Sequence, residues 1–188
     1  FGYGRLLPAG MLREPLAGLR RADAVILTHA GKLPPEERER LVGRLRKLKP
    51  GLVVADAVHV PVRLRDHRTG ALLPLETLRG RRWLAVSGLG QPESFENTLA
   101  DQGVAEAVPA RFPDHHTYSE AEIRAAAARV REAALAGIVT TEKDAVKIPA
   151  GWLADCPCLV LEVDLQFLRG QQDLEALLRS RIAKTQHA

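Results

Sequence analysis

Aromatic side chains are scarce in this sequence, since Phe, Trp and Tyr together make up 4% of its 188 residues. Hydrophobic residues still reach 46%, so the core has to be built mainly from Leu, Val, Ile and Ala. No apolar run approaches the roughly 20 residues that span a bilayer as a helix, and no signal peptide is recognisable. These features predict a soluble globular protein.

Cysteine is also rare, with only Cys156 and Cys158 in the stretch DCPC. Separated by a single proline, the two thiols are poorly placed for a disulfide or a closed zinc site. We therefore expect two small, buried and reduced side chains in a cytoplasmic protein. A glycine-rich phosphate loop ending in Gly-Lys-Ser/Thr is missing as well, so the sequence itself contains no Walker A motif.

Neither sign of charge is lacking, because the sequence contains 27 Lys and Arg and 23 Asp and Glu. The net charge of +4 and the pI of about 9.4 are too mild for a dedicated nucleic-acid binder, and we expect no nucleic acid as a partner. Most of the basic residues are arginines, which suit bidentate contacts with phosphate or carboxylate. A general bias of the chain towards Arg and Ala explains the same observation.

Strand-like and helix-like segments alternate along the chain, which predicts an α/β fold with a mainly parallel, doubly wound sheet and flanking helices. A turn near Thr69-Gly70 predicts a short antiparallel hairpin within 65–75, and Ser119 with Glu122 forms a capping box. The expected strands are 22–29, 51–64, 81–90, 105–112, 137–141 and 158–164. The expected helices are 34–48, 92–103, 119–135, 142–148 and 173–183.

Sheets of this class bind ligands where the carboxyl ends of strands meet the amino ends of helices. That rule selects three junctions, Gly88–Glu93, Phe112–Glu122 and Thr140–Asp144. At the first, two glycines precede a helix start that attracts anions, although a tight turn serving only the fold is the favoured explanation from the sequence alone.

The second junction holds Asp114, His115 and His116 just before a helix. The positive end of that helix favours neutral imidazole, which can accept a proton or bind a phosphate, and Asp114 could fix a ring tautomer. The simpler alternative is that one histidine packs and the other is solvated. Zinc is not expected, because no second pair of ligands stands at a suitable spacing.

The third junction, TTEKDAVK, packs two threonines and charges of both signs into one strand-to-helix turn. Lys143 and Asp144 could meet a phosphate or a metal, or form a local ion pair and cap. The amino-terminal stretch carries Arg5, Arg13 and Glu14 in a rigid loop suited to phosphate recognition. Glu14 would weaken an anion site unless it binds a metal or orients an arginine.

Four motifs together resemble the tetraacyldisaccharide 4'-kinase (lipid A 4'-kinase) family, in the family's order. They are GYGRLLPAGMLREP (2–15), GLGQPESF (88–95), FPDHHTY (112–118) and TTEKDAVK (140–147). Tyr3 and Met11 depart from the family, which usually has Asn and Pro at these positions. A tyrosine cannot reproduce an amide hydrogen bond, which argues against a ligand role at position 3.

The resemblance implies ATP-dependent phosphorylation of the 4'-hydroxyl of tetraacyldisaccharide 1-phosphate, a step of lipid A biosynthesis. It implies a P-loop kinase that uses ATP and Mg²⁺ and acts peripherally at the cytoplasmic face of the Gram-negative inner membrane. The lipid A disaccharide precursor, ATP and the membrane surface are the implied partners. Residues 1–50 would then be the remainder of a kinase core domain and 51–188 a carboxyl-terminal α/β domain, unless the two form one continuous domain.

Site residues follow from the motif positions. His115 is the implied proton acceptor, acting with an aspartate expected upstream, and His116 is the less favoured choice. Glu14 is a second candidate for the catalytic site, Arg13, Arg5, His116 and Asp114 are candidates for binding substrate or phosphate, and no residue is assigned to a metal.

The family's Walker A loop would lie upstream, so we expect this polypeptide alone to show no kinase activity. The competing hypothesis is a non-catalytic α/β module that binds a phosphorylated sugar or nucleotide.

Overall fold

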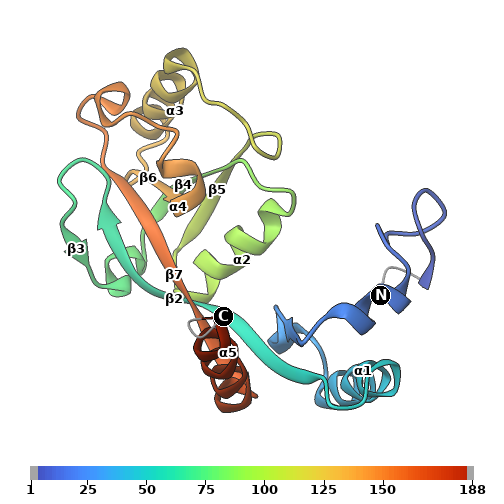
Figure 1. Ribbon diagram of the computed structural model, residues 1–188. Helices are drawn as coiled ribbons and strands as arrows, with labels where there is room; N and C mark the ends of the chain where they lie inside the picture. The colour runs from blue at the N-terminus through green and yellow to red at the C-terminus, as the bar shows by residue number, and fades with distance from the viewer. Residues whose placement is uncertain (1–3, 186–188) are drawn as a thin grey trace. The chain divides into compact units, whose positions relative to one another are not determined.

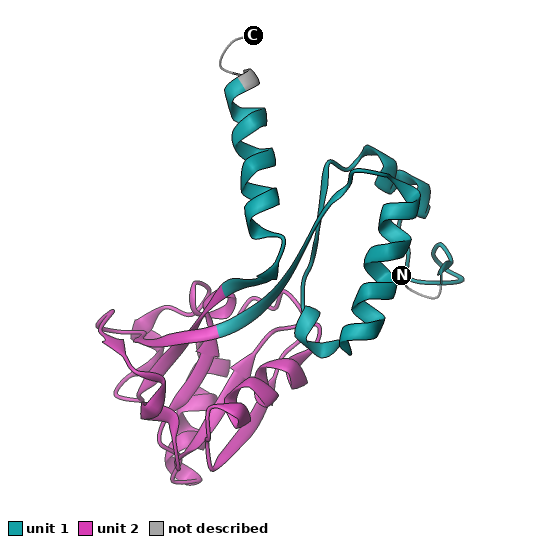
Figure 2. Ribbon diagram, turned by 90° about the horizontal axis from the view of Figure 1, so that it is seen from below, with its two compact units in different colours: residues 1–60, 165–188 teal, residues 61–164 magenta. Residues whose placement is uncertain are grey.

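The computed structural model describes residues 4–185 and divides the chain into two compact units. Unit 1 comprises residues 1–60 and 165–188, and unit 2 comprises residues 61–164 (Figure 2). Two long strands, β2 (Val53–Asp66) and β7 (Cys158–Arg169), continue from one unit into the other. The assignment of 1–50 and 51–188 to separate domains stays a prediction, because compactness alone does not say which residues belong to which domain of a kinase.

The described strands form one sheet of seven in the order β1-β2-β7-β6-β4-β5, with β3 paired to β2 outside this path. The pairs β1·β2, β4·β5, β4·β6 and β6·β7 are parallel, and β2·β3 is antiparallel. The expected mainly parallel α/β sheet with a short antiparallel hairpin is therefore confirmed. Pro61 lies between the parts of β2 that pair with β1 and with β3, where a missing N–H breaks neither of these ladders.

Unit 2 holds most of the elements shown in Figure 1. Its strands are short, with β4 and β6 mostly buried and β5 partly exposed, and its α-helices begin at proline or after a capping hydroxyl. They are β3 (Leu72–Leu73), β4 (Arg82–Ser87), α2 (Pro92–Asp101), β5 (Glu106–Arg111), α3 (Glu120–Glu132), β6 (Ile138–Thr141) and α4 (Glu142–Ala145), with 3₁₀ helices at Leu75–Leu78 and Ala150–Leu153.

Helices cover both faces of the sheet in unit 2, because alternate strand residues point to opposite sides. On one face Leu84 and Val86 of β4 pack with Ile123 of α3, and on the other Trp83 and Ala85 pack with Phe95 and Leu99 of α2. This arrangement is the double winding that the alternation of strands and helices predicts.

Unit 1 contains a smaller core. Its elements are a 3₁₀ helix (Leu16–Arg21), β1 (Ala24–Leu27), a 3₁₀ turn (Ala30–Lys32), α1 (Pro35–Leu48) and α5 (Gln171–Thr185). Val42 and Leu45 of α1 pack on Leu52 and Val54 at the start of β2. Acidic residues in the first turn of α1 and basic residues in its last turn complement the helix dipole.

Candidate active site

The carboxyl ends of β4 and β6 lie side by side in unit 2, with Val86 in register with Thr140. The loops that follow these strands meet the loop after β5, so the structure brings the three predicted junctions together. The backbone N–H of Gly88 donates to Asp144 Oδ2 at 3.0 Å, and Lys143 Nζ donates to Asp114 Oδ1 at 2.9 Å. Asp144 and Asp114 therefore link the three loops to one another. We call these three junctions, Gly88–Glu93, Phe112–Glu122 and Thr140–Asp144, the platform.

Asp144 links two of these loops and is fully buried, with 0% of its surface exposed. Besides Gly88 it accepts hydrogen bonds from Thr141 Oγ1 at 2.9 Å and from Lys147 Nζ at 3.3 Å. Thr141 also caps α4 by accepting from the Asp144 N–H. Of the two alternatives for TTEKDAVK, the cap and a local ion pair are present, but Lys143 reaches a different loop.

Asp114 is half-exposed and holds its own loop rather than a histidine ring. It accepts from the backbone N–H of His115 at 3.0 Å, whereas His115 Nε2 lies 3.8 Å from its other oxygen, beyond hydrogen-bond distance. The hydrogen bond from Lys143 is the main reason that the pKa of Asp114 is lowered, with the charges of His115 and Lys143 adding to it. The carboxylate is therefore ionised at neutral pH.

His115 stands at the tip of the loop with 78% of its side chain exposed. Its backbone is left-handed, with φ of 59°, a conformation uncommon outside glycine and typical of tight turns. An exposed imidazole on a turn that Asp114 and Lys143 hold in place is accessible to a bound substrate.

His116 is packed, with 21% of its side chain exposed. Its ring stacks on Phe112 at a centroid distance of 4.9 Å and meets the edge of Tyr118 at 5.0 Å. Its Nε2 lies 3.1 and 3.2 Å from the two oxygens of Glu122. His116 is therefore packed and His115 is solvated, which agrees with the simpler interpretation of the DHH motif.

Glu122 links this histidine to the helix start. Ser119 donates to its Oε2 from both the backbone N–H and the hydroxyl, each at 2.8 Å, and completes the predicted capping box. These hydrogen bonds from Ser119, followed by the one from His116, lower the pKa of Glu122 to about 2. The ionised carboxylate fixes the loop against α3.

Two buried hydroxyls near the platform were not predicted from the sequence. Tyr118 Oη and Ser87 Oγ have no hydrogen-bond partner among the described residues. Burial, followed by the negative charge of Asp144, raises the pKa of Tyr118 above its usual value. A Cβ built on Gly88 would lie 3.2 Å from the Tyr118 oxygen, so glycine keeps the space between them open.

The other predicted site residues belong to unit 1. Arg5 and Arg13 are exposed, and neither side chain has a hydrogen bond or ion pair within the described part of the chain. Glu14 forms an ion pair with Arg21 at 2.5 Å, so it orients an arginine, one of the two roles expected for it. Because His115 belongs to unit 2, a common role for these residues and His115 stays a prediction.

A second polar cluster in unit 1 was also missed. Asp56 is buried in β2, with Arg169 at 2.9 Å and Arg38 at 3.5 Å. The ring of His29, just after β1, lies 5.3 Å from the ring of His59 within β2, and burial lowers the pKa of His29 with help from the charges of Lys32 and His59. An aspartate inside an apolar run was the signal available in the sequence.

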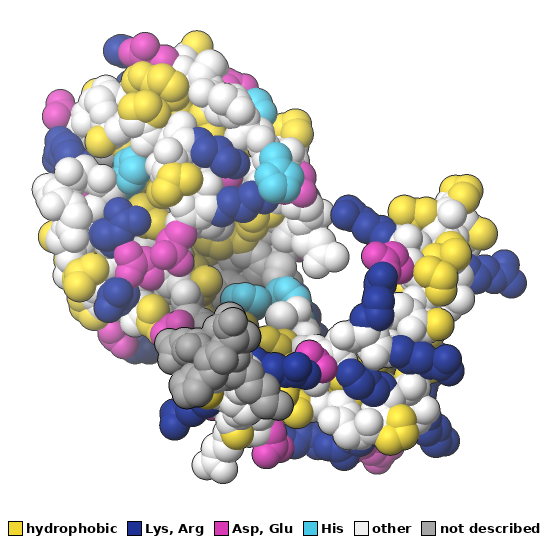
Figure 3. Space-filling model, viewed as in Figure 1, with side chains coloured by type: hydrophobic (Ala, Val, Ile, Leu, Met, Phe, Trp, Pro, Cys, Tyr) yellow, Lys and Arg dark blue, Asp and Glu magenta, His cyan; other side chains and the backbone are white. Residues whose placement is uncertain are grey.

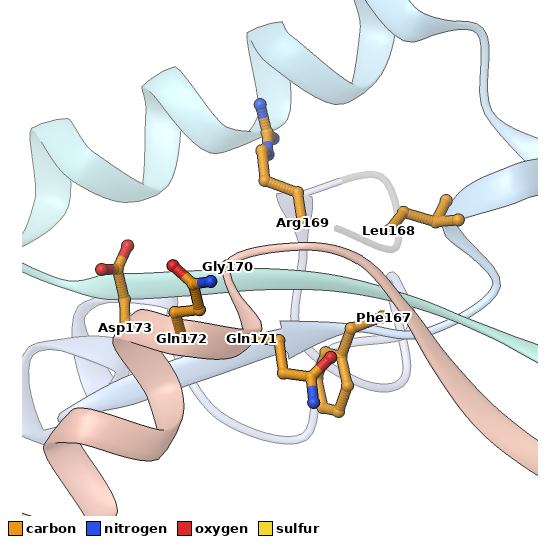
Figure 4. Close-up of a pocket in the computed structure, with 7 residues that line it drawn as sticks. All are labelled: Phe167, Leu168, Arg169, Gly170, Gln171, Gln172 and Asp173. Atoms are coloured by element: carbon orange, nitrogen blue, oxygen red, sulfur yellow. The ribbon is translucent and has the colours of Figure 1, made fainter.

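A hollow of about 290 Å³ lies at the turn between β7 and α5, lined by Phe167–Asp173 (Figure 4). Figure 4 shows the Arg169 side chain pointing away from Phe167 and Gln171. Its guanidinium is engaged by Glu39 and Asp56. Because its cation is neutralised, this hollow is a poor anion site, and the platform of unit 2 remains the better candidate.

Cys156 and Cys158 are free thiols, as expected, but only Cys158 is buried, whereas Cys156 is partly exposed. Burial raises the pKa of Cys158 to about 12. Among residues 4–185 no three His, Cys, Asp or Glu side chains gather as a metal site. None of the helices in this part of the chain is both long and apolar enough to cross a membrane.

The fold and the platform define an α/β protein with a polar loop cluster at the carboxyl edge of a mainly parallel sheet. Comparisons with known proteins give the family. Residues 1–183 match the family model described as tetraacyldisaccharide-1-P 4'-kinase. The chain therefore belongs to the tetraacyldisaccharide-1-P 4'-kinase family.

Curated relatives support this assignment. The tetraacyldisaccharide 4'-kinase of Anaeromyxobacter sp. (strain K) is 41% identical over 185 residues, covering 97% of this chain and 49% of that protein. The enzyme of the same name from Elusimicrobium minutum is 37% identical over 152 residues, covering 81% of this chain and 40% of the relative. The chain thus spans about half the length of these relatives.

A solved structure shares the fold. The crystal structure of the "apo" form of LpxK from Aquifex aeolicus in complex with ATP matches with a TM-score of 0.56 and 25% sequence identity. The match covers 94% of this chain and 48% of the Aquifex chain. The expected resemblance to the lipid A 4'-kinase family is therefore confirmed.

Proposed function

We propose that this chain takes part in ATP-dependent phosphorylation of the 4'-hydroxyl of a tetraacyldisaccharide 1-phosphate, a step of lipid A biosynthesis. The observation that carries this proposal is the family match over residues 1–183, with relatives named for that reaction. The ATP complex of the Aquifex neighbour supports ATP as the phosphoryl donor. The platform of unit 2 offers ionised and imidazole side chains that could position the attacking hydroxyl in such a transfer.

His115 is the residue proposed to take the proton of the attacking hydroxyl. Its exposure leaves the imidazole accessible, and its loop is held by the Lys143–Asp114 pair. His116 is better suited to holding the loop, because its Nε2 is occupied by Glu122 and its ring is stacked on Phe112. A base held in a fixed place contributes more to proton transfer than a mobile one.

Arg13 and Arg5 are proposed to bind phosphate, since both guanidinium groups are exposed and a guanidinium grips phosphate with two hydrogen bonds. Glu14 would hold the nearby guanidinium of Arg21 through its ion pair. Mg²⁺ normally accompanies ATP in kinases. The described residues provide no set of three metal ligands, so Mg²⁺ rests on the family alone.

The substrate of this reaction is a lipid, and we place the reaction at the cytoplasmic face of the inner membrane. With no membrane-crossing helix among residues 4–185, the contact proposed for this part of the protein is peripheral.

The test is the phosphoryl-transfer rate of the catalytically active protein with His115→Ala, His116→Ala and Thr117→Ala. If His115 accepts the proton, His115→Ala lowers turnover by about 10²–10⁴-fold. Thr117 is exposed in the same loop and is the matched control, expected to change turnover less than about threefold. A loss confined to His116→Ala would reassign the base, and phosphosugar binding without any turnover would favour a non-catalytic module.

A further inference from the structure

A small closed loop near the amino terminus presents apolar side chains to solvent. The Leu7 N–H donates to the Leu12 carbonyl at 2.9 Å, and the Leu12 N–H donates to the Arg5 carbonyl at 3.1 Å. Gly10 closes the loop, because a Cβ at this position would collide with the Arg5 backbone. We name residues 5–13 the apolar loop. Its hydrogen bonds fix which side chains face outward.

The side chains at the tip of the apolar loop are large and exposed. Leu7 is 61% exposed, Met11 is 71% exposed and Leu6 is 43% exposed. A cavity of about 340 Å³ beside them is lined mainly by apolar groups from Met11 to Ala22. Single exposed leucines are ordinary, but three large apolar side chains on one closed loop beside an apolar cavity form a patch that indicates a binding partner.

The charges around this patch identify the partner. Arg5 and Arg13 flank the loop without partners among the described residues, and Arg20 and Arg21 follow in the adjacent 3₁₀ helix. Glu14 is the one acidic residue from position 4 to 22. In Figure 3 this segment, at the right of the view, shows hydrophobic side chains flanked by Lys and Arg. An apolar tip ringed by cations complements an anionic lipid surface.

We propose that the apolar loop is a membrane-contact site, with Leu7 and Met11 entering the interfacial region of an anionic bilayer while Arg5 and Arg13 bind lipid phosphates. The choice of a bilayer rests on the proposed lipid substrate, since an apolar patch alone would also suit a protein. The cavity beside the loop has room for part of an acyl chain.

The test measures binding of the 188-residue chain to sedimented vesicles of phosphatidylcholine, with and without phosphatidylglycerol. The chain is expected to bind the anionic vesicles, and less as salt rises. The double variant Leu7→Ser, Met11→Ser is expected to bind at least about tenfold more weakly, because burial of both side chains is lost. Arg5→Gln is expected to weaken binding about fivefold to anionic vesicles only.

Val146→Ser is the matched control. Val146 is also a large exposed apolar residue, at 84% exposure, but it belongs to unit 2 and is distant from the apolar loop in sequence. It should bind vesicles like the unchanged chain, and circular dichroism confirms that every variant is folded. Equal vesicle binding by the double variant and the unchanged chain would overturn the inference and leave a protein as the occupant of the patch.

The outcome is independent of the proposed kinase activity. Vesicle binding by the 188-residue chain that the double variant loses would support the membrane site whatever the kinase assay gives, because this chain alone is not expected to transfer a phosphoryl group. In the catalytically active protein, phosphoryl transfer to a short-chain, water-soluble substrate should be unchanged by the double substitution if the loop contacts only the bilayer. A loss of that activity with vesicle binding intact would overturn the inference.

Discussion

Glu122 shows how one side chain links helix capping to the candidate site. Its carboxylate accepts two hydrogen bonds from Ser119 and lies 3.1 Å from His116 Nε2, which together lower its pKa from 4.5 to about 2. The unfolded chain therefore takes up the proton first as pH falls. The stability that Glu122 contributes is complete above pH 4.5 and is lost as pH falls towards 2.

Glu122→Gln should remove this part of the acid dependence. We expect the urea midpoint of unfolding to fall less steeply between pH 4.5 and 2 in the variant than in the unchanged chain. The midpoints of these two proteins should differ most above pH 4.5. The side chain is partly exposed, so salt should shrink the difference. Glu132→Gln, at the far end of α3 and without a hydrogen bond among the described residues, is the control; the same slope in all three proteins would contradict the assignment.

At the scale of elements, the loop after β4 and the loop after β5 are fitted against each other at Gly88. A Cβ at this position would lie 3.1 Å from the Pro113 carbonyl and 3.2 Å from both Asp144 Oδ1 and Tyr118 Oη. Gly88→Ala should therefore displace the loop that carries His115, and we expect a loss of about 1–3 kcal/mol in the free energy of unfolding. Urea unfolding and the NMR shift of the His115 ring measure the two effects.

Gly151→Ala is the control, since no atom lies within 4 Å of the Cβ that it would add. If Gly88→Ala were as stable as Gly151→Ala and left the His115 signal in place, the two loops would not be fitted in the way described.

The elements themselves could be predicted because their signals are local. Ser119 with Glu122 marks the start of α3, and buried apolar runs mark β4 and β6. The three junctions could also be predicted, because the carboxyl ends of parallel strands share one edge of the sheet. What failed was the pairing of side chains, since Lys143 pairs with Asp114, 29 positions away, and nothing local specifies that partner.

Burial of polar groups was only partly visible in the sequence, where Asp56 inside an apolar run was the one signal and its partners were not apparent. Asp56 stands inside an apolar strand with arginines from positions 38 and 169, and only the fold brings those three side chains together. The same holds for Tyr118, whose burial beside Asp144 depends on the packing of α3. Contacts between distant residues thus decided both the site and the polar cluster of unit 1.

At the scale of the whole molecule, the two units have separate cores. The two clusters built on β4 and β6 lie wholly within residues 61–164, one on each face of the sheet. The cluster found among the described residues of unit 1 lies within residues 19–54 and packs α1 against two parallel strands. Because stability follows buried apolar surface, unit 2 should be the more stable of the two.

Native-state hydrogen exchange of the full chain tests this difference. We expect amides of α1 and β1 to exchange through openings of lower free energy than amides of β4, β6 and α3. Leu45→Ala should speed exchange in unit 1 alone, whereas Ile123→Ala, also at a fully buried position, should lower protection across unit 2 by about 2–5 kcal/mol. One common opening free energy, lowered equally everywhere by either substitution, would show that the long strands β2 and β7 join the two cores into a single cooperative unit.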